Sequence, residues 1–195
     1  MTDFWLFFKL GLEHVLDWQA YDHVLFIIVL CAAYTFNAWR KLLVLVTLFT
    51  VGHTISLLLA NYGVVSVSSS WIECLIPITI LVTALFNLFT AGKEKRAEKL
   101  GVLYVATVFF GLIHGFGFAG YFKMISGDND VLHLLEFALG IEAAQLIVVI
   151  LVLILAFLMQ TIFRFNKRDW VLVISSIVIG LVIPMLIDNC FFLFS

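Results

Sequence analysis

Charged residues are scarce in this sequence. Only 12% of its 195 residues are Asp, Glu, Lys or Arg, about half the share found in an average soluble domain. No polar stretch is long enough to fold as a separate soluble domain. The basic residues also form no stripe with interleaved aromatic residues, so we expect no nucleic acid partner.

Cysteine is also rare. Cys31, Cys74 and Cys190 share no CxxC spacing, so the sequence predicts neither a disulfide framework nor a thiolate metal site. Cys74 follows Glu73 and has two interpretations, a soft metal ligand or a buried inert thiol. The N-terminal residues show neither a basic region nor an A-x-A-like site, so we expect no cleaved signal peptide.

Apolar residues are abundant, at 64% of the chain. Continuous apolar runs recur along its length, several of them near or above the roughly 18 residues that cross a bilayer. They predict an all-α, polytopic transmembrane bundle of about seven helices, in one transmembrane domain over residues 1–195. The first run is short and polar, so it can span the membrane, form a re-entrant segment or lie at the interface. In the last two cases six helices cross the membrane. The runs lie near residues 4–19, 22–38, 42–61, 71–91, 100–122, 132–161 and 170–189.

Basic residues set the expected orientation. They follow the second, fourth and sixth runs, at 40–41, 93–99 and 164–168, and the positive-inside rule places these loops in the cytoplasm. The loops at 62–70 and 123–130 and the C-terminus then face outward, and so does the site described below. If the first run spans, the N-terminus is cytoplasmic. We expect a multi-pass protein of the bacterial inner membrane, in contact with lipid, with Trp18, Trp71 and Trp170 in the interfacial belt.

This orientation places histidines and carboxylates from several helices in the outer half of the membrane. Each ionisable group within a span costs about 2.5–3.5 kcal/mol on insertion scales, so these side chains should face the bundle interior and share partners or a ligand. Gly111 and Gly115 form a GxxxG around His114, which favours close approach of another helix. The candidate ligands are His14, Asp22, His23, His53, Glu73, His114 and Glu142.

Histidine together with carboxylate suits a divalent transition metal such as Zn, Ni or Co. Three polar side chains on the same helix faces, Thr50, Ser56 and Gln145, are candidates for orienting the ligands. Plainer roles remain open for each group. A membrane histidine can bond between helices, Asp22 can be a helix N-cap, and Glu73 can interact with a helix dipole.

Five segments resemble, in order, the motifs of the HupE/UreJ family, small bacterial membrane proteins linked to hydrogenase and urease gene clusters. The resemblance covers about residues 11–146 and implies a nickel, or nickel and cobalt, permease. It marks Gln145 and all seven candidate ligands. The sequence departs from the family pattern at Ala20, at Ala138 and in the long spacing from His14 to Asp22. The segments are "GLEHVLDWQAYDHVLF", "FTVGHTISL", "WIECLIPITI", "FGLIHGFGFA" and "FALGIEAAQL".

Three functions fit these residues. The first is a permease that passes a nickel- or cobalt-type ion through the cluster. The second is an intramembrane zinc enzyme that acts on a lipid or lipid-linked substrate from the outer leaflet, with Glu142 or Glu73 as general base and Ser56 or Thr54 as an accessory group. The third is a metal- or proton-sensing partner subunit. No HExxH motif supports the enzyme, and the family favours the permease.

Overall fold

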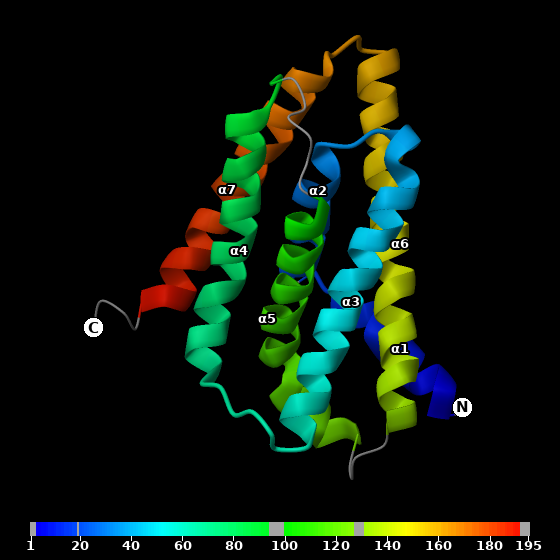
Figure 1. Ribbon diagram of the computed structural model, residues 1–195, viewed down its shortest axis with the longest axis vertical. Helices are drawn as coiled ribbons and strands as arrows, with labels where there is room; N and C mark the ends of the chain where they lie inside the picture. The colour runs from blue at the N-terminus through cyan, green and yellow to red at the C-terminus, as the bar shows by residue number, and fades with distance from the viewer. Residues whose placement is uncertain (1–2, 19, 94–99, 127–130, 192–195) are drawn as a thin grey trace.

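The computed structural model is an all-helical bundle (Figure 1). It describes residues 3–18, 20–93, 100–126 and 131–191. The expected basic loop at 94–99, residues 127–130 of the expected acidic loop, and Gln19 of the first run lie outside these ranges. The helices are α1 (Asp3–Leu16), α2 (Asp22–Ala32), the short 3₁₀ helix η1 (Phe36–Ala38), α3 (Trp39–Asn61), α4 (Ser69–Thr90), α5 (Leu100–Ser126), α6 (Val131–Thr161) and α7 (Lys167–Cys190).

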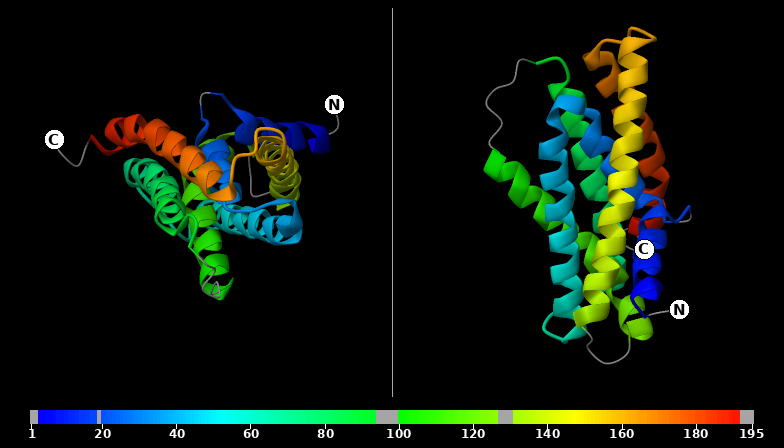
Figure 2. Two further views of the ribbon diagram at one scale, coloured as in Figure 1. Left: turned by 90° about the horizontal axis from the view of Figure 1, so that it is seen from above. Right: turned by 90° about the vertical axis from the view of Figure 1, so that its right-hand side faces the viewer.

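The prediction of an all-α membrane bundle is confirmed. The helices α3 to α7 are each long and apolar enough to cross a bilayer. The 31 residues of α6 extend about 46 Å, well beyond a hydrocarbon core of about 30 Å. Figure 2 shows α6 running the full length of the molecule. The chain is therefore a multi-pass membrane protein.

The first two helices are too short to cross a bilayer alone. With 14 residues α1 extends about 21 Å, and with 11 residues α2 extends about 17 Å. In Figures 1 and 2 the chain passes from α1 to α2 near mid-height, and α2 continues from there toward the end where α3 begins. The two helices thus form an interrupted pair, and the described residues of the break between them are exposed.

The expected continuous helix over 22–38 is wrong, because α2 ends at Ala32. Thr35 is extended, with φ −122° and ψ 173°, and η1 follows it. Tyr34 is 8% exposed, and Lys41 Nζ lies 4.8 Å from the centre of its ring. The apolar run continues through this turn, so hydropathy alone does not reveal where the helix stops.

Glycine brings two pairs of helices into backbone contact. A Cβ on Gly52 would meet the carbonyl oxygen of Val108, and a Cβ on Gly111 would meet that of Phe49, so α3 and α5 pack without an intervening side chain. Gly11 and Gly140 allow α1 and α6 to pack in the same way. The crossing expected around Gly111 and Gly115 is thus present, and it presses the His53 turn of α3 against α5.

Two expectations at the helix ends are wrong. Cys74 at the start of α4 forms a disulfide with Cys190 at the end of α7, 116 residues away. Neither the soft-ligand nor the inert-thiol interpretation of Cys74 holds, because the packing of α4 against α7, which no sequence spacing reveals, brings the two thiols together. Trp170 is 2% exposed and packs near Ala156, so it is an interior residue and not an interfacial one.

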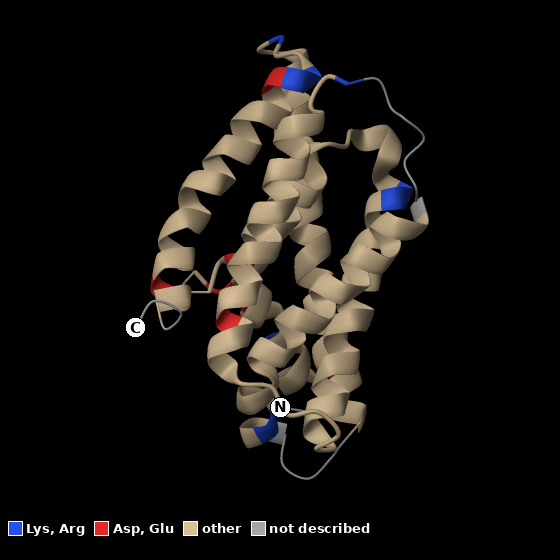
Figure 3. Cartoon of the chain, turned by 60° about the vertical axis from the view of Figure 1, so that its left-hand side comes forward, with Lys and Arg blue, Asp and Glu red and all other residues tan. Residues whose placement is uncertain are grey.

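Charge divides the bundle along its length (Figure 3). Most Lys and Arg positions lie at the end where α3 begins, α4 ends and α7 begins, and most Asp and Glu positions lie nearer the other end. The pattern agrees with the basic loops expected on one side of the membrane.

Candidate metal centre

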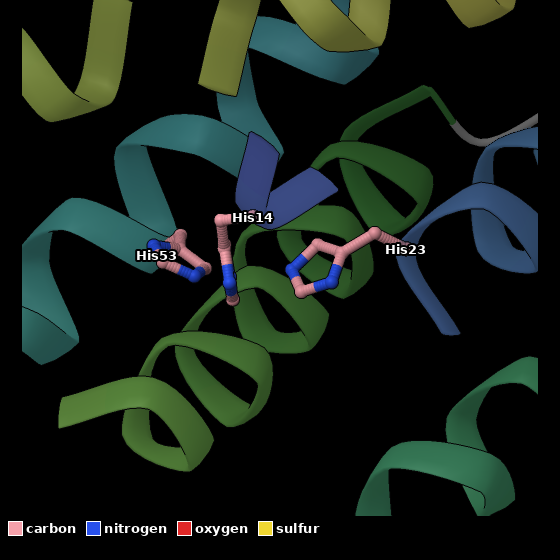
Figure 4. A group of neighbouring side chains, drawn as sticks. All are labelled: His14, His23 and His53. Atoms are coloured by element: carbon pink, nitrogen blue, oxygen red, sulfur yellow. The ribbon is translucent and has the colours of Figure 1, made fainter. Parts of the chain in front are cut away.

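Three histidines from three helices converge at the break between α1 and α2. His14 lies in the last turn of α1, His23 in the first turn of α2, and His53 in the middle of α3. One ring nitrogen of each lies within 4.8 Å of those of the other two. Figure 4 shows the three rings turned toward a common centre. A single ion bound at the usual Zn–N distance of about 2.0–2.1 Å needs only modest side-chain rotation to reach all three.

The interrupted helix pair creates this convergence. His14 at the end of α1 and His23 at the start of α2 lie nine residues apart in the sequence. In one continuous helix they would be more than two turns apart, whereas the break brings their rings together. The C-terminal end of α1 also directs its unpaired carbonyl groups, the negative end of the helix dipole, toward the break. Interrupted helices serve membrane transporters in this way, by exposing helix termini to an ion.

Asp22 orients His23. Its Oδ1 lies 3.1 Å from His23 Nδ1 and 2.9 Å from the backbone nitrogen of His23. A carboxylate beside Nδ1 favours the tautomer in which Nδ1 carries the proton and donates to Oδ1. The lone pair then resides on Nε2, the atom free to bind a cation.

His114 has a comparable partner on its own helix. Its Nδ1 lies 2.8 Å from the carbonyl oxygen of Phe110, which can only accept, so Nδ1 is the protonated nitrogen. The lone pair of Nε2 then points into the bundle. The His114 ring centre is 5.2 Å from that of His23, which places a fourth imidazole beside the group of three.

These histidines leave buried ring nitrogens without hydrogen bonds. In the described part of the chain, the unpartnered atoms include Nε2 of His14, His23 and His114 and both ring nitrogens of His53. His53 is completely buried. Each buried unsatisfied polar group costs about 1–3 kcal/mol. Five such atoms in one region form a donor set that a borderline divalent cation fits.

Aromatic rings surround the histidines. Phe118 lies 3.9 Å from His14 between ring centres, and Phe49 lies 5.0 Å from His114. Phe118 follows His114 by four residues and therefore shares its helix face, but as one of many phenylalanines it does not stand out in the sequence. The rings offer no acceptor or donor to the imidazole nitrogens, so aromatic packing alone does not explain why histidine occupies these positions.

A cavity of about 890 Å³ leads to the centre from one side. Its walls include His14, His23 and His114 and, in addition, four carboxylates from α1, α2, α4 and the break. No Lys or Arg lies among the described residues of its lining. The four are Glu13, Asp17, Asp22 and Glu73.

Glu142 lies elsewhere. Its Oε1 accepts a hydrogen bond from Thr47 Oγ1 at 2.5 Å, between α3 and α6, and it does not belong to the group of three histidines. One turn from Thr47, Thr50 Oγ1 donates to Gln145 Oε1 at 3.0 Å. Ser56 Oγ donates to the carbonyl oxygen of His53 at 2.8 Å, on its own helix.

Comparison with known proteins identifies one family. The model of the family described as HupE / UreJ protein matches residues 1–188, which extends the resemblance beyond the segments that carry its motifs. No curated protein and no solved structure matches the chain.

Proposed function

Since the chain belongs to the HupE/UreJ family, a family associated with nickel and cobalt transport, we propose that it is a permease for a nickel- or cobalt-type divalent cation. The observation that carries this proposal is the group of imidazoles at the α1–α2 break, with ring nitrogens that are buried and lack hydrogen bonds. The ion is the cargo, and His14, His23 and His53 are its ligands.

Entry is through the acidic cavity. Carboxylates along low-dielectric walls concentrate cations at the mouth and speed their capture. Glu73 and Asp17 form part of this wall, and Asp22 at the inner end holds the His23 ring. The ion exchanges water for imidazole there, which offsets the cost of burying its charge.

Onward passage follows polar pairs between α3 and α6. Thr50 with Gln145 lies one turn of α3 beyond His53, and Thr47 with Glu142 lies two turns beyond, about 9 Å along the axis. In this direction α3 leads toward the basic end of the bundle. We assign Glu142 to this second stage, as a group that meets the ion, or an exchanging proton, after it leaves the histidines.

The proposed orientation places the acidic cavity outside the bacterial inner membrane. The basic end faces the cytoplasm by the positive-inside rule. The Cys74–Cys190 disulfide supports the same orientation, because disulfides persist in oxidising compartments and this one lies at the end opposite the basic loops.

Nickel flux into proteoliposomes tests the proposal. Purified protein with the acidic cavity outward should admit Ni²⁺ faster than empty vesicles, and His53→Ala should reduce the rate by more than about tenfold, since it removes a ligand of the ion. His133→Ala is the matched control, because His133 lies on α6 against Phe7, outside the centre. Equal flux in the His53 variant and the wild type would refute the assignment.

One observation favours a second function. Three histidines beside an open cavity are also the ligand set of a catalytic zinc site, in which the fourth position holds a water of lowered pKa. Metal retention separates the two functions. A zinc enzyme keeps about one ion per chain through exhaustive dialysis, whereas a cargo ion must bind weakly enough to leave.

A further inference from the structure

A second cavity lies at the opposite end of the bundle and has the opposite charge. It encloses about 540 Å³ between α2, α4, α5 and α7. Three cations line it: Lys93 just after α4, and Lys167 and Arg168 at the start of α7. No Asp or Glu lies among the described residues of its lining.

The fold positions one of these cations, Arg168, against the end of α4. Gly92 has φ +77°, a conformation that favours glycine, and a Cβ there would also meet Cδ of Arg168. The absence of a side chain at Gly92 thus lets Arg168 lie across the end of α4. A fourth cation, Lys41, lies over the ring of Tyr34, which itself lines the cavity.

The deeper wall is different. It is built mainly from apolar side chains, among them Leu30, Phe86 and Leu103, which descend from the charged rim into the part of the bundle that faces hydrocarbon. A cavity with a cationic rim and an apolar floor at the level where spans begin and end has the polarity profile of a phospholipid, charged at one end and hydrocarbon at the other.

The charge also excludes the metal cargo. A divalent cation in this cavity would meet three positive side chains and, in the described lining, no carboxylate, so it is poorly suited as the exit for nickel or cobalt.

We propose that this cavity binds the phosphate group of an anionic phospholipid of the cytoplasmic leaflet, with Lys93, Lys167 and Arg168 on the phosphate and an acyl chain on the apolar floor. Basic pockets between transmembrane helices on this side of a membrane bind lipid head groups. Free phosphate would satisfy the rim but leave the apolar floor empty, so the structure favours the lipid. The proposal does not depend on the metal function.

Native mass spectrometry of the full chain tests the proposal. Protein released from mixed micelles of phosphatidylglycerol and phosphatidylcholine should retain phosphatidylglycerol preferentially. The variant Lys93→Gln/Lys167→Gln should weaken that retention about 25-fold, since each of the two basic groups contributes a factor of about five near an anionic surface. It spares Arg168, which packs on Gly92, and so avoids disturbing the end of α4.

Arg40→Gln is the matched control. Arg40 lies at the same end of the bundle, over the Trp39 ring, and does not line the cavity. Its loss should leave retention unchanged, whereas an equal loss in both variants would mean that the basic end attracts lipid without a site. Equal retention of phosphatidylcholine, or competition by inorganic phosphate at the concentration of the lipid, would overturn the lipid assignment. Unchanged thermal unfolding of each variant confirms that folding is intact.

Discussion

At the scale of the residue, the key feature is the group that contacts Nδ1 of a histidine ring and so leaves Nε2 free to bind an ion. Asp22 and the carbonyl oxygen of Phe110 each fix one nitrogen of a histidine ring and leave the other without a hydrogen bond inside the bundle. An ordinary buried histidine uses both nitrogens. Leaving Nε2 exposed to a shared space is expected of a ligand, because the ion supplies what hydrogen bonds do not.

Asp22→Asn tests this arrangement directly. The amide keeps the volume but loses the charge, so His23 is less firmly oriented and less basic toward the ion. We expect nickel affinity to fall about 10–100-fold, as is usual for the outer partner of a ligating histidine. Isothermal titration of the detergent-solubilised protein measures it. Glu13→Gln, a change of the same kind in the cavity wall, should have a smaller effect because Glu13 pairs with Lys9 at the surface.

Metal binding should also depend on pH, with a definite sign. Imidazole binds a metal only in its neutral form, so protons compete with nickel for the three histidines. Acidification should therefore weaken nickel binding and release the ion, and raising the pH should strengthen binding. Equilibrium dialysis from about pH 8 down to the onset of acid unfolding follows this change. An affinity that does not fall anywhere in that range would mean that imidazoles do not hold the ion.

The sequence identifies the candidate histidines, but it does not show which of them lie together in the structure. His53 and His114 stand out as costly residues deep in apolar runs, and the motif resemblance marks them together with His14 and His23. In the structure, three histidines form a group, His114 lies beside it and Glu142 lies apart. This arrangement depends on which helices pack together. That packing comes from contacts between residues far apart in the sequence, which periodicity does not encode.

At the scale of the element, backbone contact between α3 and α5 positions His53. Gly111→Ala would place a methyl group against the carbonyl oxygen of Phe49, which cannot move without shifting α3. We expect destabilisation of about 1–3 kcal/mol, the usual cost of overpacking, seen as a lower thermal unfolding midpoint. Gly120→Ala on the same helix is the control. No atom lies within 4 Å of its added Cβ, so it should leave stability unchanged or raise it slightly through helix propensity.

The ends of the long helices can be predicted from the sequence, but the end of α2 cannot. The positions of α3 to α7 follow from hydropathy to within a few residues, because each must match the thickness of the bilayer. The end of α2 at Ala32 cannot be predicted in this way, since the apolar run continues beyond it. The α1–α2 break, which brings His14 to His23, therefore had to be seen in three dimensions.

At the scale of the whole molecule, the bundle is polarised. An acidic cavity leads to the histidines from one end, and a basic cavity lies at the other. The disulfide between Cys74 and Cys190 joins α4 to α7 near the acidic end. If that end faces the oxidising side of the membrane, the disulfide should be formed in cells.

Thiol labelling of the protein in whole cells measures the disulfide and the orientation together. We expect Cys74 and Cys190 to resist alkylation after unfolding until a reductant is added, while Cys31, a free buried cysteine, is alkylated once the protein unfolds. Alkylation of all three cysteines without reductant would contradict the proposed orientation.

The central claim is that the imidazoles at the α1–α2 break bind the transported ion, and X-ray absorption spectroscopy of the nickel-loaded protein tests it most directly. We predict the scattering signature of several imidazole rings around nickel, lost in a His14→Ala/His53→Ala variant and retained in His133→Ala. A nickel ion surrounded only by oxygen, with the same spectrum in all three proteins, would contradict the claim.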